Sequence, residues 1–135
     1  MKLVINGEKC TGCLLCVLAC SFKHEKTFSL VNSRIRVESD EIKNVHKISV
    51  CIQCETHPCV DACPTNAFYY DDNLSIYKIN EEICTGCGAC VRACPYDGIT
   101  INSTGKAIKC DLCDGNPVCV NYCIFPKALT VLVNK

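Results

Sequence analysis

Residues 84–95 read Cys84-Thr85-Gly86-Cys87-Gly88-Ala89-Cys90-Val91-Arg92-Ala93-Cys94-Pro95. The spacing, C-x2-C-x2-C-x3-C-P, is the bacterial-type ligand run for a [4Fe–4S] cluster, in which three thiolates hold one cluster and the fourth ligates another. We therefore expect Cys84, Cys87 and Cys90 to share a cluster and Cys94 to belong to a second one. Such a run requires a partner run elsewhere in the chain.

Three further runs of four cysteines accompany this one. In two of them the second gap is widened, to four and to five residues, and Pro64 closes one of these. Gly12 and Gly86 are expected to let the loops wrap closely around a cluster and donate backbone N–H groups to its sulfurs. Numbered in chain order, run one is Cys10, Cys13, Cys16 and Cys20; run two is Cys51, Cys54, Cys59 and Cys63; run three is Cys84, Cys87, Cys90 and Cys94; run four is Cys110, Cys113, Cys119 and Cys123. The runs use all 16 cysteines, which predicts four [4Fe–4S] clusters.

The composition argues against several classes of protein. The 135-residue chain is long enough for one domain or two very small ones. Its 14 basic and 14 acidic side chains cancel, which gives no basis for binding nucleic acid. Residues 1–7 hold too few apolar residues for a signal peptide, and no stretch approaches the roughly 18 apolar residues that span a bilayer. We expect a cytoplasmic protein without membrane insertion, in a compartment that keeps thiols reduced.

Between the runs, short strand patterns and turns predict an α+β fold with short hairpins and short helices. Cys16 and Cys20 are four residues apart, so they are expected on one helical turn. Residues 39–41 are a predicted turn, and residues 71–73 are the predicted turn of a hairpin between runs two and three. Strands are predicted at residues 2–5, 33–38, 45–50, 64–70, 74–79, 99–101, 106–108 and 128–133.

Two pairings of the runs compete, because each fourth cysteine has to complete the cluster of another run. Consecutive pairing joins run one with two and run three with four, whereas nested pairing joins two with three and one with four. The hairpin between runs two and three is the compact connection of a two-cluster ferredoxin, while the stretch after run one is longer and less regular. A strand at residues 128–133 that pairs with residues 2–5 would also bring runs one and four together. These observations favour nesting.

Nested pairing assigns ligand sets and two ferredoxin-like lobes. Residues 1–48 with 106–135 form the outer lobe, and residues 49–105 form the inserted lobe. The expected ligand sets are Cys51, Cys54, Cys59 and Cys94; Cys84, Cys87, Cys90 and Cys63; Cys10, Cys13, Cys16 and Cys123; and Cys110, Cys113, Cys119 and Cys20. No nucleophile, general base or substrate pocket is apparent, so we do not expect an enzyme.

Zinc and disulfides are the alternative uses of these cysteines. C-x2-C pairs also bind tetrahedral zinc, and run four, with its widened gap, is the most open to that interpretation. The endings of runs two and three, with proline after the fourth cysteine, argue against zinc there. A framework of disulfides suits a short secreted protein but not tight C-x2-C clusters. Iron and sulfide analysis separates these alternatives.

Few other side chains suggest chemistry. His24 is expected at the surface, because no run is short of ligands, and His57 is expected to support the widened loop of run two rather than to ligate. Lys9, Arg92 and Lys109 flank or lie within runs. A positive charge near a cluster would raise the reduction potential of that cluster, but we expect these three side chains to be solvated.

On these motifs the chain resembles the four-cluster ferredoxin-type electron-transfer subunits of anaerobic oxidoreductases, the iron–sulfur subunit family of dimethyl-sulfoxide reductase and formate dehydrogenase. The matching stretches are residues 10–20, 51–64, 84–95 and 109–113. The resemblance implies the same nested ligand exchange. Many members have a longer insertion where this chain has only residues 114–118. The compact build is similar to the small subunits that accompany tungsten-dependent aldehyde oxidoreductase-type enzymes.

The resemblance implies a relay of single electrons between a large catalytic subunit, of tungsten- or molybdenum-pterin type, and a redox partner. That partner is expected to be a flavin subunit or a soluble ferredoxin, and one end cluster is expected to lie under a protein interface. The alternative functions are a free-standing soluble polyferredoxin and a structural zinc protein. A large subunit that co-purifies would separate the first function from the second.

Overall fold

The computed structural model describes residues 2–40, 42–43, 45–123 and 128–132. These residues form two-stranded antiparallel sheets connected by short helices. Neighbouring strands form hairpins: β2 (Arg36–Asp40) with β3 (Val45–Ser49), β4 (Phe68–Asp71) with β5 (Ile76–Ile79), and β6 (Ile99–Ile101) with β7 (Ala107–Lys109). The two ends of the chain also pair, β1 (Lys2–Ile5) with β8 (Leu129–Leu132).

The predicted pairing of the terminal segments is therefore confirmed, and so is the hairpin between runs two and three. The turn predicted at residues 39–41 is wrong for its first two residues. Ser39 and Asp40 belong to β2, and Asp40 pairs with Val45. The same strand begins at Arg36 rather than at Ser33. Residue 41 lies outside the described residues.

Each run carries a helix that begins one residue before its third cysteine. α2 (Pro58–Ala62), α3 (Ala89–Ala93) and α4 (Val118–Tyr122) each contain 5 residues, and short 3-10 turns, η1 (Gly7–Lys9) and η2 (Leu112–Gly115), lie before run one and within run four. α1 (Leu15–Glu25) is longer than predicted, with 11 residues. Lys23 and His24 occupy its last turn, where the helix dipole favours positive charge.

Two clusters of buried side chains hold these elements together, and both contain cysteines. The larger cluster includes Leu3, Val17, Ile35, Leu112 and Leu129 together with Cys16, Cys20, Cys51, Cys110 and Cys119. The smaller cluster contains Cys59, Ala67, Cys84, Cys90, Ile99 and Ala107. Thiols and aliphatic side chains thus share the same buried space, so the core of the protein and its candidate ligands coincide.

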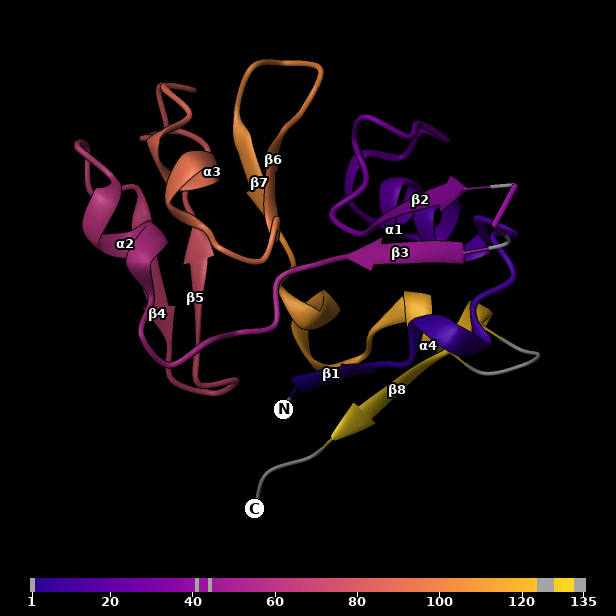
Figure 1. Ribbon diagram of the computed structural model, residues 1–135. Helices are drawn as coiled ribbons and strands as arrows, with labels where there is room; N and C mark the ends of the chain where they lie inside the picture. The colour runs from indigo at the N-terminus through magenta and orange to yellow at the C-terminus, as the bar shows by residue number, and fades with distance from the viewer. Residues whose placement is uncertain (1, 41, 44, 124–127, 133–135) are drawn as a thin grey trace.

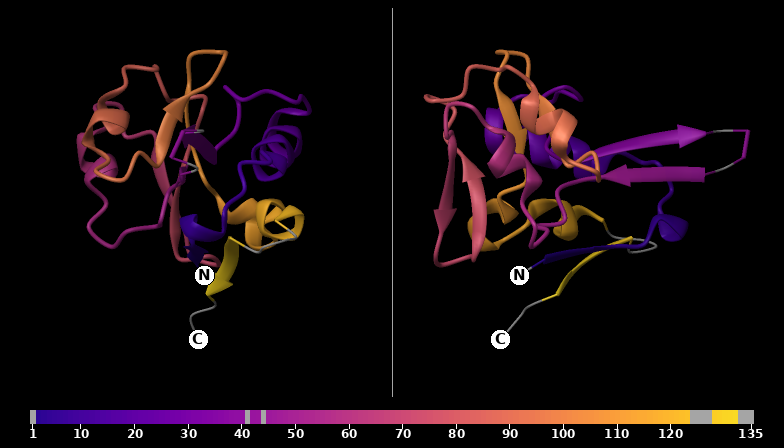
Figure 2. Two further views of the ribbon diagram at one scale, coloured as in Figure 1. Left: turned by 45° about the vertical axis from the view of Figure 1, so that its right-hand side comes forward. Right: turned by 60° about the vertical axis from the view of Figure 1, so that its left-hand side comes forward.

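The elements are spread over two sides of the molecule. Figure 1 shows α2, α3, β4 and β5 on one side and α1, α4, β2 and β3 on the other, with β6 and β7 between them. α1 packs against α4, and α2 packs against α3. The β2–β3 hairpin extends away from the body (Figure 2). Among the described helices, none has the length and apolar character required to cross a membrane.

Candidate iron–sulfur centres

Most of the thiols line cavities, and no cysteine takes part in a disulfide. One cavity, of about 210 Å³, is lined by Cys10, Cys13, Cys16 and Cys123. A second is lined by Cys20, Cys110, Cys113 and Cys119, and a third by Cys51, Cys54 and Cys59. The last cysteine of run four therefore lies with run one, and the last cysteine of run one lies with run four.

The last cysteines of runs two and three are located by their neighbours. Burial raises the pKa of Cys90, and the nearby thiolates of Cys84 and Cys63 raise it further, so Cys63 lies close to run three. Cys94 does not line the cavity of run two, but the turn that follows it packs there. The Gly98 N–H donates to Cys94 Sγ at 3.3 Å, and a β-carbon on Gly98 would lie 2.7 Å from the α-carbon of Cys51.

All four runs bend in the same way after their first cysteine. The residue two positions further on has a left-handed backbone in each run; these residues are Gly12 (φ 75°), Gln53 (φ 56°), Gly86 (φ 75°) and Leu112 (φ 57°). This bend turns the backbone N–H of Gln53, Gly86 and Leu112 back onto the first sulfur of the run, at 3.4 Å in each case. Donation by Gly86 was predicted, whereas Gln53 and Leu112 carry side chains that do not signal such a bend.

A second type of turn follows the fourth cysteines of runs two and three. Asn66 (φ 55°) and Asp97 (φ 54°) are left-handed three residues after Cys63 and Cys94. The next N–H, that of Ala67, donates to Cys63 Sγ at 3.3 Å, as Gly98 does to Cys94. Hydrogen bonds to sulfur stabilise negative charge on the thiolate and are among the features that set cluster potentials.

Burial makes some of the metal-free thiols weaker acids. It raises the pKa of Cys16 to about 12 and that of Cys59 to about 11, and the surrounding thiolates contribute to both shifts. Since the thiolate is the form that binds metal, iron has to displace protons from these groups and then compensate their charge. A set of thiols around one cavity, some of them buried, free of disulfides and supplied with N–H donors, is the donor chemistry of an iron–sulfur cluster.

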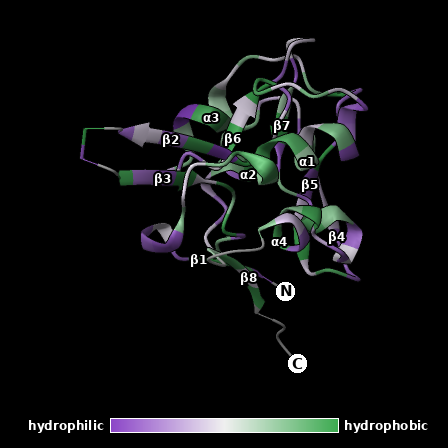
Figure 3. Ribbon diagram, turned by 90° about the vertical axis from the view of Figure 1, so that its right-hand side faces the viewer, coloured by the Kyte–Doolittle hydropathy of each residue, from purple (hydrophilic) through white to green (hydrophobic). Residues whose placement is uncertain are grey.

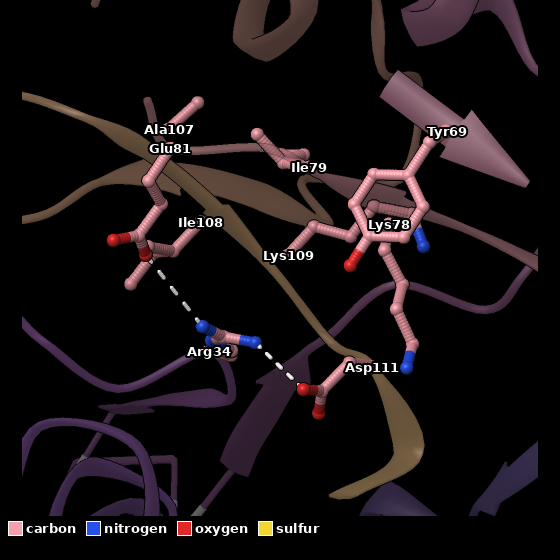
Figure 4. A pocket seen from close by; sticks show the side chains of 9 residues that line it. All are labelled: Arg34, Tyr69, Lys78, Ile79, Glu81, Ala107, Ile108, Lys109 and Asp111. Carbon is pink, nitrogen blue, oxygen red and sulfur yellow. Dashed lines mark ion pairs between the residues drawn. The ribbon is translucent and has the colours of Figure 1, made fainter. Parts of the chain in front are cut away.

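A charged network that the sequence did not indicate borders the cavity of run four. His24 is not a surface residue, because its side chain is only 10% exposed and its Nε2 lies 2.9 Å from Asp111 Oδ1. Arg34 forms a second ion pair with Asp111, at 3.1 Å, and one with Glu81, at 3.8 Å (Figure 4). Burial opposes the imidazolium form, but the hydrogen bond to Asp111 outweighs it and raises the pKa of His24 to about 12.

His24 also reaches the ligand run itself. Its Nδ1 lies 2.9 Å from the Cys20 carbonyl oxygen and 3.7 Å from Cys20 Sγ. Burial opposes ionisation of Cys20, yet the hydrogen bond from His24 lowers the pKa of this thiol. The signal in the sequence was the four-residue step from Cys20 to His24 on one helix face, which becomes visible only when α1 is known to continue past Cys20.

Lys109 also departs from its predicted place. Lys9 and Arg92 are exposed, as expected, whereas Lys109 is 5% exposed. Its ammonium group donates to the Tyr77 carbonyl oxygen at 2.6 Å and to Gln53 Oε1 at 2.7 Å. This lysine is therefore an internal cation rather than a solvated one.

Known proteins match this chain over most of its length. Two family models, each described as a 4Fe–4S dicluster domain, match residues 9–68 and 50–98. The chain is 43% identical over 122 residues to the polyferredoxin-like subunit of the aliphatic sulfonate oxidoreductase of Pyrococcus furiosus, covering 90% of this chain and 70% of that protein. The chain belongs to the 4Fe–4S ferredoxin-type electron-transfer subunits.

Two further relatives agree with this membership. The ferredoxin-type subunit is 35% identical over 132 residues to the thiosulfate reductase electron transfer subunit of Salmonella typhi, covering 87% of this chain and 68% of that one. Its structure resembles a chain of the active site complex BamBC of benzoyl coenzyme A reductase, with a TM-score of 0.54 and 26% identity over 95% of this chain and 74% of that chain. Both dicluster matches include run two, since their ranges overlap at residues 50–68.

The sixteen thiols of this ferredoxin-type subunit fit four [4Fe–4S] clusters. The predicted cofactor and the predicted role, an electron-transfer subunit rather than a catalytic one, agree with the family.

Proposed function

We propose that this chain relays single electrons between a catalytic oxidoreductase subunit and a second redox partner, through clusters whose ligands the runs exchange in nested pairs. Four thiols from two distant runs around one cavity are the observation that carries the proposal. The proposed ligand sets are Cys10, Cys13, Cys16 and Cys123; Cys110, Cys113, Cys119 and Cys20; Cys51, Cys54, Cys59 and Cys94; and Cys84, Cys87, Cys90 and Cys63. When bound, each cluster supplies one-electron redox chemistry.

The proposed sites form a row. Beyond the effect of burial, the thiolates of Cys20 and Cys16 raise the pKa of Cys119, so the sites of runs one and four are neighbours. The Cys51 thiolate likewise raises the pKa of Cys110, so the site of run two comes next. Because α2, in run two, packs against α3, in run three, the site of run three lies next to that of run two. The proposed order of the sites is therefore run one, run four, run two and run three, which follows the arrangement in Figure 1.

The same arrangement supports two lobes, residues 1–48 with 106–135 and residues 49–105. The β1–β8 pair closes the first lobe, and α2, α3 and the β4–β5 hairpin build the second. The larger buried cluster also includes Val50, Cys51 and Ile76. The two proposed lobes therefore share a continuous apolar contact, which would keep neighbouring sites at a fixed separation.

The partner proposed for this chain is a tungsten- or molybdenum-pterin subunit of the aldehyde oxidoreductase type, with a flavin subunit or soluble ferredoxin as the other partner. The name of the Pyrococcus furiosus relative, a polyferredoxin-like subunit of an oxidoreductase, supports a catalytic partner. Anaerobic affinity purification of the tagged chain from its native host tests this proposal. We expect a large subunit in fixed stoichiometry, containing tungsten or molybdenum, and about sixteen irons on this chain.

Other results of that purification would point elsewhere. A chain with about sixteen irons but no partner, which reduces several acceptors, would be a free-standing polyferredoxin. A chain with zinc and no acid-labile sulfide would overturn the electron-transfer role. A partner without tungsten or molybdenum would remove only the metal assignment.

A further inference from the structure

An apolar groove lies between α1 and α4, at the run-one end of the proposed row. It has a volume of about 440 Å³, and its lining includes Leu15, Phe22, Phe28, Val118 and Tyr122. Phe22 and Phe28 stack with their ring centroids 4.9 Å apart, although they are 46% and 70% exposed. Figure 3 looks onto this side and shows hydrophobic positions on both helices. Adjacent exposed aromatic rings of this kind mark an interaction surface.

The charges at the groove indicate the kind of partner. Lys23 and Lys26 also line it, and no carboxylate is present among the lining residues that the structure describes. In a symmetric dimer both faces would be this same patch, so its lysines would be buried against a lining that offers no carboxylate among the described residues, which is unfavourable. An apolar surface of this type suits a permanent subunit better than a transient carrier. We propose that the catalytic subunit docks here through an apolar segment flanked by Asp or Glu side chains; this inference rests on the proposed function.

The position of the groove fits electron transfer. Leu15 directly precedes Cys16, Val118 directly precedes Cys119, and Tyr122 directly precedes Cys123. A chain seated on these side chains would lie beside thiols of the run-one and run-four sites and would exclude water from them. The apolar groove therefore lies at the proposed end of the row.

Two matched variants test the docking surface. Phe22→Asp combined with Phe28→Asp places charge in the groove, whereas Ile42→Asp changes an apolar side chain that is 98% exposed elsewhere. We expect the double variant to keep about sixteen irons but to retain the catalytic subunit about tenfold less well or worse, and Ile42→Asp to behave as wild type. A carbodiimide, which joins amines to carboxylates, should link Lys23 or Lys26 to Asp or Glu of the catalytic subunit.

The outcomes separate the two proposals. If the wild-type chain brings no subunit, the proposed function and the docking inference fail together. If the wild type and the double variant retain the subunit equally, only the docking surface is overturned. A wild-type chain that sediments as a dimer and a double variant that sediments as a monomer would identify a second copy as the occupant and overturn the inference.

A separate observation concerns Lys109, the internal cation between two of the proposed sites. Its ammonium group donates only to neutral acceptors, the two named above and the carbonyl oxygen of Cys110 at 3.3 Å. Among the described residues it has no ion-pair partner, although a buried charge requires compensation. Figure 4 shows Lys109 in the same cavity lining as the ion-paired Lys78 and Arg34.

The negative charge that would compensate Lys109 comes from the cysteine thiolates of run two. Lys109 lines the cavity formed by Cys51, Cys54 and Cys59, where four thiolates around an oxidised cluster would leave about two negative charges. Gln53 fixes the lysine in place, since its Oε1 accepts from Lys109 and its Nε2 donates to the Cys110 carbonyl oxygen at 2.9 Å. We infer that Lys109 is the counter-ion of the run-two cluster and raises its reduction potential by stabilising the extra electron.

Redox titration followed by electron paramagnetic resonance tests this role. Lys109→Met should lower the midpoint potential of one cluster by at least a tenfold change in its reduction equilibrium, about 59 mV for one electron. The affected signal should be the one that Cys94→Ser removes. Lys109→Arg should keep the potential near that of wild type, and Lys43→Met, at an exposed side chain, should change nothing.

A second substitution guards against misfolding of the Lys109 variant. Gln53→Glu leaves Lys109 in place but supplies a carboxylate next to it, so it should lower the same potential. The role is overturned if Lys109→Met and Gln53→Glu leave every potential unchanged, or if Lys109→Arg lowers it as far as Lys109→Met does.

Discussion

The fourth cysteine of a run is the residue that distinguishes nested exchange from a cluster closed within its own run. Cys94→Ser should release about one cluster, or four of about sixteen irons, and the loss should fall on run two. The physical reason is that Gly98, hydrogen-bonded to Cys94, packs against Cys51. Anaerobic alkylation followed by mass spectrometry would detect which thiols become reactive. We expect Cys51, Cys54 and Cys59 to react, and Cys63, Cys84, Cys87 and Cys90 to stay protected.

Cys63→Ser is the matched control for this exchange. Cys63 lies near Cys90, so its loss should expose Cys84, Cys87 and Cys90 and leave the thiols of the run-two cluster protected. If each substitution instead exposes the thiols of its own run, the nested ligand sets are wrong.

Close approach of the backbone at Gly98 makes a second prediction at the residue scale. A β-carbon there would lie 2.7 Å from the backbone of Cys51, whereas one at Gly105 would meet nothing within 4 Å. Gly98→Ala should therefore cost about 1–3 kcal/mol through overpacking and should loosen the run-two cluster. Gly105→Ala, where φ is +83°, should cost only about 1 kcal/mol of backbone strain. Equal thermal stability and equal Cys51 alkylation would contradict this prediction.

At the scale of elements, the β1–β8 pair should control the cavity of run one. Leu129 is 0% exposed and lines that cavity together with Cys123. Leu129→Ala removes buried volume and should cost about 2–5 kcal/mol. It should also make Cys10 and Cys13 more reactive to alkylation. Thr130→Ala, at an exposed position on the same strand, should leave both stability and alkylation unchanged; if both variants behave alike, the strand is not what supports the site.

At the scale of the whole molecule, the clusters should be required for the fold. Buried apolar side chains here include eight cysteines: Cys16, Cys20, Cys51, Cys59, Cys84, Cys90, Cys110 and Cys119. Iron removal by an anaerobic chelator, with a reductant present to prevent disulfides, should therefore abolish cooperative thermal unfolding and most far-ultraviolet dichroism. A metal-free chain that still melts cooperatively near the holoprotein's temperature would show that the aliphatic core suffices.

Local features were predicted well because they depend on residues close in sequence. The β4–β5 hairpin and the helical turn at Cys16 follow from short patterns, and the cysteine spacing identified every thiol that lines a cavity. The extent of α1 was missed because its second half is held by His24, which bonds to Asp111, 87 residues away. The left-handed bends at Gln53 and Leu112 were missed because ordinary side chains occupy them.

The sequence by itself determined the chemistry of this protein: sixteen thiols in four runs, each spaced so that a tight turn can present three sulfurs to one cluster. Tertiary structure alone decided that His24 and Lys109 are enclosed rather than solvated. The physical reason is the distance along the sequence over which each property is decided. Ligand spacing within a run is fixed by a few consecutive backbone angles, whereas burial and charge compensation depend on segments that only the completed fold brings together.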